Sequence, residues 1–391
     1  MINISRVLSL RFTSILLLIL LAVSIIFFLQ SSIIENKNSS TINSITNNIN
    51  IDSINSETKN IKIGFKPPPL SKSVKEWLKG EPIENFEKGK IYIVEFWATW
   101  CVPCKLAMPR LSELASRYKD KVIVVGINTL ENKSTTINDV KTFVDKMGRS
   151  MNYYVAKEKD NLMESSWLIA SGEREQGIPR TFIVNDSGKL AWIGHPKDLE
   201  VILPKIINKT WDINEALNKR ITEKYLANLD DSLNNHVLWK YKANCTKPDG
   251  MPDSALQAIA KILKEHPGLK YAPFIAYNTF SALLKTNQEA AYDYGKVAIT
   301  TSVYEEPPFN YISQIINSYS NSRQLKLLPK IYSLGAEAFQ AEIDYGPYPE
   351  LIDHLPKYRK MAEWYSRAGD KKKAEELKQK ILEFQKHRSL K

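Results

Sequence analysis

The sequence predicts an α/β domain with a mixed sheet flanked by helices, followed by an all-α domain of helical hairpins and preceded by a transmembrane helix. Three observations support this prediction. Apolar runs with strand spacing and helix spacing alternate between residues 91 and 207. From about residue 211 the strand-like runs stop, and apolar residues recur at helical spacing. Near the N-terminus, residues 12–29 form an apolar run about long enough to cross a bilayer.

Length, composition and charge limit the functional classes. The 391 residues suffice for two domains after a targeting segment, and 43% hydrophobic residues exclude a wholly disordered chain. A net charge of +11 raises the question of nucleic-acid binding. Lysines and arginines are spread among acids, however, without an arginine-rich arm or a nucleic-acid motif. We therefore expect no nucleic-acid partner and interpret the charge as a solvated basic surface near acidic lipid.

The first 60 residues are predicted to contain a membrane anchor and a linker. Arg6 and Arg11 precede the apolar run, which places residues 1–30 as a cytoplasmic N-terminus and a transmembrane helix, with the rest of the chain outside. A cleavable signal peptide is the alternative, but its apolar region is usually shorter and no Ala-x-Ala-like site follows Leu29. Residues 31–60 are rich in Ser, Asn, Thr and Ile, and this polar composition predicts a disordered linker.

Residues 61–210 are predicted to form the α/β domain. Turn signals between short apolar pieces at 61–90 indicate an extended entry segment, with a hairpin as an alternative, before a buried strand at 91–97. A turn at 185–188 joins the last two strands as a hairpin. Strands interleaved with helices and ending in a hairpin predict a mixed sheet with helices on both faces. The remaining elements that we expect are helices at 102–118, 137–147 and 199–207, and strands at 122–127, 153–155, 181–184 and 190–193.

Residues 211–391 are predicted to form a repeat-like helical domain. Apolar residues recur at helical spacing, and prolines mark the helix breaks. Two stretches, beginning near Phe280 and Met361, resemble each other as paired helices with a small residue at the crossing, which is typical of tetratricopeptide-type hairpins. Because arrays of paired helices present extended surfaces, we expect a protein partner on this domain.

The reactive chemistry is expected at Cys101 and Cys104. An apolar strand delivers Cys101 to the start of a helix, where free N–H groups and the helix dipole favour a thiolate. Two thiols at this spacing can close into a reducible disulfide. A zinc site would need further ligands at matching spacing, but only Cys245 and five scattered histidines remain. We expect no metal and no other cofactor, and we interpret Cys245 as a lone thiol of the helical domain.

The residues around this pair resemble one family. Residues 96–105, Phe-Trp-Ala-Thr-Trp-Cys-Val-Pro-Cys-Lys, look like the active site of thioredoxin-fold proteins. With Met108 and Pro109 after them, they are most similar to the membrane-anchored TlpA/ResA-like thiol–disulfide oxidoreductases. A second block, residues 177–195, resembles the family's segment around its cis-proline. The resemblance spans about residues 61–210, and a C-terminal helical extension is also seen among relatives.

The resemblance implies a role for several residues. Cys101 would be the attacking thiolate and Cys104 the resolving thiol of a redox-active disulfide. Pro179, preceded by Ile178, would be the cis-proline that faces this pair and lies along an extended substrate. Glu95 stands six residues before Cys101, where thioredoxins carry a buried acid. Its apolar neighbours predict a raised pKa, so it could accept the proton of Cys104.

The resemblance also implies a surface that docks the substrate. Ala107 stands where ResA-like members often carry a Glu, so the sequence does not support a specialisation in cytochrome maturation. No histidine lies between the two cysteines, which favours reduction over strong oxidation. The residues expected at the docking surface are Trp97, Trp100, Val102, Pro103 and Ile178.

We therefore predict an envelope thiol–disulfide oxidoreductase that reduces protein disulfides. The resemblance implies a bacterial protein anchored in the inner or cytoplasmic membrane, with the catalytic domain on the periplasmic or outer side. It further implies a CcdA/DsbD-type membrane protein as the electron donor. One alternative is an oxidase or isomerase with the same dithiol chemistry. The other is a scaffold or binding protein in which the helical domain is the working part.

Overall fold

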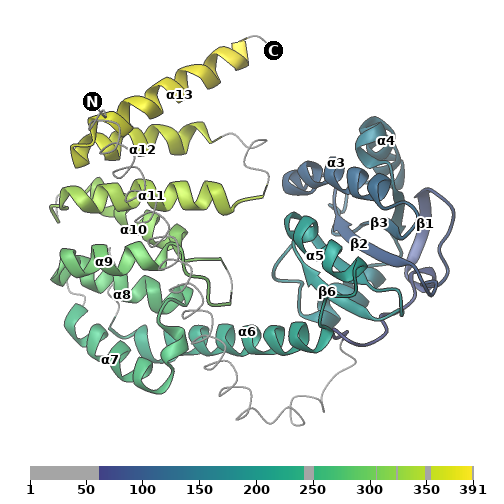
Figure 1. The fold of residues 1–391 in the computed structure, drawn as a ribbon, viewed down its shortest axis with the longest axis horizontal. Coiled ribbons are helices and arrows are strands. Elements are labelled where there is room, and N and C mark those ends of the chain that lie inside the picture. The colour runs from purple at the N-terminus through teal and green to yellow at the C-terminus, as the bar shows by residue number, and fades with distance from the viewer. Residues whose placement is uncertain (1–60, 242–250, 305, 323–324, 348–353, 390–391) are drawn as a thin grey trace, which may run out of the picture. The chain divides into compact units, whose positions relative to one another are not determined.

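The computed structural model describes residues 61–241, 251–304, 306–322, 325–347 and 354–389 (Figure 1), which all belong to one unit of the chain, residues 58–391. The predicted anchor at 12–29, the predicted linker at 31–60 and Cys245 lie outside the described residues. Among the helices that are described, none is both long enough and apolar enough to span a bilayer.

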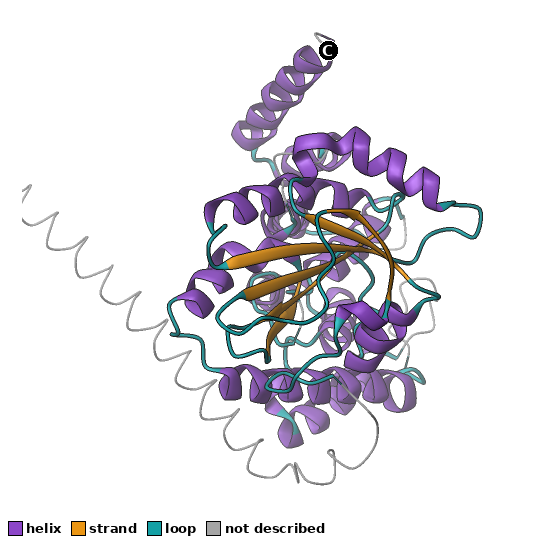
Figure 2. Cartoon of the chain, turned by 90° about the vertical axis from the view of Figure 1, so that its right-hand side faces the viewer, coloured by secondary structure: helices purple, strands orange, loops and turns teal. Residues whose placement is uncertain are grey.

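A six-stranded mixed sheet forms the centre of the α/β domain, as the sequence predicts (Figures 1 and 2). Its strands are β1 (Val74–Lys79), β2 (Ile91–Trp97), β3 (Val122–Asn128), β4 (Tyr154–Glu158), β5 (Arg180–Val184) and β6 (Leu190–Gly194). Their order in the sheet is β1-β4-β3-β2-β5-β6. β2, β3 and β4 run parallel, whereas β1, β5 and β6 are each antiparallel to their neighbours. The central position of β2 places its C-terminal end, and the cysteines after it, in the middle of one sheet edge.

β2 is buried along its whole length because apolar residues cover both faces of the sheet. Such a run is typical of a central strand of an α/β sheet. Pleating directs alternate side chains to opposite faces. Ile91, Ile93 and Trp97 belong to the core cluster that also contains both cysteines, whereas Tyr92 and Phe96 belong to the cluster on the other face.

Helices cover both faces of this sheet (Figure 2). α3 (Val102–Arg117), α4 (Ile137–Met147) and α5 (Leu199–Ile207) contribute to the core cluster that contains the cysteines. A π-helical segment (Glu164–Ile169) and the first turns of α6 (Ile213–Leu233) contribute to the other cluster. The domain boundary predicted at residue 210 falls just before α6. The first turns of this helix pack in the α/β core, and its later turns pack with the helices that follow. That boundary stays a prediction.

The described elements after α6 are helical, which confirms the predicted helical region; its repeat type stays a prediction. The neighbours α7 and α8, α8 and α9, α10 and α11, α11 and α12, and α12 and α13 pack against each other, and α8 and α9 also contact α10 and α11 respectively (Figure 1). Trp364 is fully buried in this core and stacks on Phe339 with 5.0 Å between ring centroids. The helices are α7 (Pro252–Glu265), α8 (Pro273–Thr286), α9 (Gln288–Ala298), α10 (Phe309–Ser320), α11 (Pro329–Tyr345), α12 (Leu355–Ala368) and α13 (Lys371–Ser389).

Candidate active site

Cys101 and Cys104 form a disulfide at the start of α3. β2 ends at Trp97, and the loop at 98–100 brings the chain to Cys101, which caps the helix. The Cys104 backbone N–H points at Cys101 Sγ, 3.2 Å away. Pro103 lies in the first helical turn, where a proline breaks no helical hydrogen bond. After reduction, the Cys104 N–H and the helix dipole would favour a thiolate on Cys101 over a thiol.

The segment expected to hold a cis-proline lies beside the disulfide. The Ile178–Pro179 peptide bond is cis, and the Ile178 carbonyl oxygen lies 3.6 Å from Cys101 Sγ. Ile178 is half-buried, Pro179 is buried, and β5 begins at the next residue, Arg180. Arg180 pairs with Phe96 at the end of β2. Because β2 and β5 are antiparallel neighbours, the start of one meets the end of the other, which brings together residues 77 positions apart.

Glu95 is a buried carboxylate on the sheet face that carries the disulfide. It is 1% exposed, and it pairs in the sheet with Gly126 on β3 and Thr181 on β5. Among the described residues, neither carboxylate oxygen has a hydrogen-bond partner. The loss of hydration raises the pKa of Glu95 well above its ordinary value. A carboxyl group in this state can hold a proton and exchange it during turnover, as a general acid–base requires.

The side chains expected to dock a substrate differ in their exposure. Trp100 and Val102 are 48% and 62% exposed, and Pro103 is exposed beside them. Trp97 is only 1% exposed and stacks on Phe143 with 5.4 Å between ring centroids. Strand alternation directs Trp97 into the core, on the same face as the buried carboxylate two residues before it. The prediction that Trp97 forms part of the docking surface is therefore wrong.

A carboxylate that the sequence did not single out, Glu131, fixes the loop before the disulfide. Its Oε1 accepts hydrogen bonds from the Thr99 N–H at 2.6 Å and from Asn128 Nδ2 at 2.7 Å. Its Oε2 accepts one from the Thr99 hydroxyl at 2.8 Å, and Trp100 Nε1 donates to the Leu130 carbonyl at 2.8 Å. The residues that follow parallel neighbouring strands meet at one sheet edge. A carboxylate three residues beyond β3 is the sequence signal that points to this contact.

His195, just after β6, has a structural role. Its Nδ1 accepts a hydrogen bond from the Lys197 N–H at 3.1 Å and so caps a short helix at Pro196–Asp198. Desolvation, with smaller contributions from Lys197 and Arg180, lowers the pKa of His195 to about 4. The imidazole is therefore neutral near neutral pH. Nowhere in the described part of the chain do three His, Cys, Asp or Glu side chains come together as a group that could hold a metal ion.

Similarity to known proteins includes the α/β domain that contains the two cysteines. A model of the AhpC/TSA family matches residues 76–193. Protein FixW from Rhizobium leguminosarum is 34% identical over 157 residues, which cover 38% of this chain and 67% of that protein. The thiol:disulfide interchange protein HelX from Rhodobacter capsulatus is 33% identical over 123 residues, 31% of this chain and 62% of that protein. The thiol-disulfide oxidoreductase ResA from Bacillus anthracis is 33% identical over 114 residues, 29% of this chain and 60% of that protein.

A thiol-disulfide isomerase from Corynebacterium glutamicum aligns with a TM-score of 0.31 at 20% identity, over 36% of this chain and 95% of that one. The chain spans between 60% and 67% of the length of the three curated relatives FixW, HelX and ResA. The identity and coverage shared with FixW, together with the family match, show that the chain belongs to the AhpC/TSA family, with a thioredoxin-like domain of the thiol–disulfide oxidoreductase type.

Proposed function

We propose that this protein is an envelope thiol–disulfide oxidoreductase that reduces disulfides in client proteins. The observation that carries the proposal is the Cys101–Cys104 disulfide at the start of α3, with the carbonyl before a cis-proline 3.6 Å from Cys101 Sγ. A dithiol that closes at a helix start, next to a segment along which a polypeptide could lie, suits exchange with protein disulfides.

The reaction proceeds by two thiol–disulfide exchanges. The Cys101 thiolate attacks one sulfur of the client disulfide, a Cys101–client bond forms, and the other client sulfur leaves as a thiolate. Cys104 then loses its proton to Glu95 and attacks Cys101 Sγ. The Cys101–Cys104 disulfide forms and the second client sulfur leaves as a thiolate. Two electrons have then passed to the client, and its thiolates take up protons from solvent and from Glu95.

Two features of Glu95 support its assignment to proton transfer: its side chain is buried, and it lies on the sheet face that carries the disulfide. A solvated carboxylate would have released its proton far below neutral pH, whereas burial raises the pKa of Glu95. By strand alternation it lies on the sheet face that α3 covers, and α3 carries Cys104. A group that must take a proton from a thiol and return it needs both properties.

We further propose that the apolar run at 12–29 anchors the protein in the inner or cytoplasmic membrane, with the α/β domain on the periplasmic or outer side. Its length and the two arginines ahead of it support this orientation. A reductase outside the cytoplasm needs electrons delivered across the membrane. A transmembrane reductant of the CcdA/DsbD type is the proposed donor, and the helical region is the proposed site for a protein partner.

Disulfide reduction by the purified protein tests the proposal. With dithiothreitol as electron donor, the wild type is expected to accelerate insulin reduction, whereas Cys101→Ser is expected to lose the acceleration. No acceleration by the wild type would refute a reductase. The reduction potential decides between directions: a value near that of thioredoxin, about −270 mV, supports reduction, and a value near about −120 mV supports oxidation instead.

A further inference from the structure

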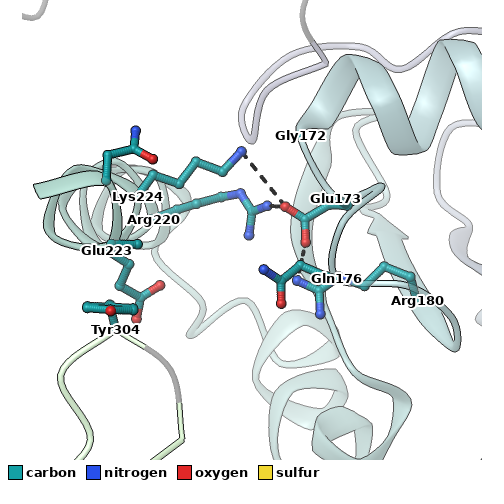
Figure 3. A pocket seen from close by; sticks show the side chains of 10 residues that line it. Gly172, Glu173, Gln176, Arg180, Arg220, Glu223, Lys224 and Tyr304 are labelled. Atoms are coloured by element: carbon teal, nitrogen blue, oxygen red, sulfur yellow. Dashed lines mark hydrogen bonds and ion pairs between the residues drawn. The ribbon is translucent and has the colours of Figure 1, made fainter. Parts of the chain in front are cut away.

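A charged pocket lies beside the segment that carries the cis-proline, and neither cysteine lines it. Figure 3 shows the side chains that line this pocket. The pocket has a volume of about 380 Å³. One wall is the segment between residues 172 and 180, and the other is a face of α6. The charged and amide side chains that line these two walls include Glu173, Gln176, Arg180, Arg220, Glu223 and Lys224.

Cations from both walls converge on one buried carboxylate. Glu173 is 1% exposed, and its carboxylate forms ion pairs with Arg180 and Arg220 (Figure 3). Lys224 Nζ lies 3.8 Å from the same carboxylate and donates a hydrogen bond to the Ser171 carbonyl at 2.6 Å. Arg220 and Lys224 are one helical turn apart and therefore lie on one face of α6. The segment before the cis-proline and the first helix after the α/β domain thus share one ionic cluster.

The pocket carries more positive than negative charge. Three cations and two carboxylates line it, so the balance is +1 when both carboxylates are ionised. Burial, the larger effect, raises the pKa of the second carboxylate, Glu223, although Lys219 and Arg220 act in the opposite direction. Burial, followed by repulsion from Arg220 and Arg180, lowers the pKa of Lys224 to about 8. An anion in the pocket would relieve this repulsion.

The pocket wall continues into the segment that touches the disulfide. Gln176 lines the pocket, and Ile178, two residues further on, has its carbonyl oxygen 3.6 Å from Cys101 Sγ. An extended chain advances about 3.3 Å per residue, so a client strand laid along this segment would reach the pocket about two to four residues from its reacting cysteine. The net charge of +11 also favours the approach of acidic polypeptides.

We propose that this pocket is a carboxylate-binding subsite that receives an Asp or Glu side chain of the client, two to four residues from the cysteine attacked by Cys101. This inference rests on the proposed function and names its substrate class: polypeptides with an acidic residue beside the disulfide. Arg220 and Lys224 supply the positive charge that recognises the carboxylate, and both belong to the helix that leads into the helical region. Client selection would then depend on that helix as well as on the thioredoxin-like domain.

Two disulfide-linked peptides of equal length, with Glu or Gln at the third position from the cysteine, test the subsite. The measured quantity is kcat/KM for their reduction by the full-length protein with dithiothreitol as donor. Each value is divided by the same variant's rate with dipyridyl disulfide, which is uncharged and reports the dithiol chemistry and the fold. The wild type is expected to prefer the Glu peptide by about fivefold, as one partly buried charge pair provides, and added salt should reduce this preference.

Matched variants separate the pocket from the general charge of the protein. Lys224→Met is expected to abolish the preference for the Glu peptide, and Lys224→Arg, which keeps the charge, to retain most of it. Lys205→Met removes an equal charge from an exposed position of α5 outside the pocket and is expected to leave the preference unchanged. Equal loss in Lys224→Met and Lys205→Met would overturn the proposal in favour of long-range attraction.

A free dicarboxylate distinguishes occupancy of the pocket from effects at the disulfide. Succinate is expected to inhibit reduction of the Glu peptide competitively and to leave reduction of the Gln peptide unchanged. Equal inhibition of both peptides, or equal kcat/KM for the two peptides with the wild type, would overturn the subsite. If the wild type reduces neither peptide nor dipyridyl disulfide, the proposed reductase function itself has failed, and this result is distinct from loss of the acidic preference.

Discussion

Replacing Glu95 by Gln removes the ionisable proton of a carboxyl group that is 1% exposed and has no hydrogen-bond partner among the described residues. The amide has nearly the same size and shape, so packing against neighbouring strands should change little. The effect of Glu95→Gln on the free energy of unfolding should therefore report the cost of ionising this carboxyl group inside the sheet. The substitution tests whether the site contains a proton-holding acid.

The sign of the effect follows from the two states of the chain. The ordinary pKa of a Glu is 4.5, and burial raises the pKa of Glu95 well above it in the folded protein. Between these two values the folded protein keeps a proton that the unfolded chain has released. The free energy of unfolding of the wild type therefore falls as pH rises, by about 1.4 kcal/mol per pH unit for one group. Below the ordinary pKa both states are protonated, and the effect disappears.

Urea unfolding at a series of pH values, from about pH 4 to about pH 8, measures this effect. The stability of Glu95→Gln minus that of the wild type should rise with pH by about 1.4 kcal/mol per unit and level off at the folded-state pKa of Glu95. Glu81→Gln, at an exposed position, is the matched control and should show no such rise. A difference between Glu95→Gln and the wild type that is constant with pH would refute a buried acid with a raised pKa.

Two further substitutions test the support of the site and the helical core. Glu131→Ala removes the acceptor of both Thr99 hydrogen bonds, so the free energy of unfolding measured by chemical denaturation should fall by about 2 kcal/mol. Disulfide reduction should also become slower, and an unchanged turnover rate would contradict a positioning role for Glu131. Gly335→Ala places a Cβ 2.7 Å from a ring carbon of the fully buried Trp364. This clash should outweigh the higher helix propensity of Ala, so thermal unfolding should show that the free energy of unfolding falls by about 1–3 kcal/mol. Gly268→Ala meets nothing within 4 Å and is the control; equal effects of the two glycine variants would contradict this packing.

Much of the α/β domain could be predicted because its elements are encoded locally. The strand at Ile91–Trp97 and the helices at Ile137–Met147 and Leu199–Ile207 have the predicted bounds, since apolar period and turn signals agree there. For β1 (Val74–Lys79) the sequence indicates only an extended segment or a hairpin within residues 61–90, and neither its bounds nor its pairing with β4. This strand lies at the sheet edge and its pattern carries charges, so its pairing with β4 depends on tertiary contact rather than on local sequence.

Some features of the site also follow from local sequence, whereas others depend on how the elements pack. Alternation along β2 places Trp97 on the same face as Glu95, so the prediction of a buried Glu95 already implied a buried Trp97. Glu131 approaches the loop before Cys101 because β2 and β3 are parallel neighbours, which requires the sheet order. The ion pair between Glu173 and Arg220 joins residues from two regions of the chain, and no local pattern marks it.

Trapping of the mixed disulfide tests the assignment of Cys101 as the nucleophile and Cys104 as the resolving thiol most directly. In a background with Cys245 replaced by Ser, Cys104→Ser should accumulate a client joined to Cys101, identified by mass spectrometry of the linked peptides. Cys101→Ser in the same background should trap no client. Clients joined to Cys104 in Cys101→Ser, with none joined to Cys101 in Cys104→Ser, would contradict the proposed order of the two cysteines.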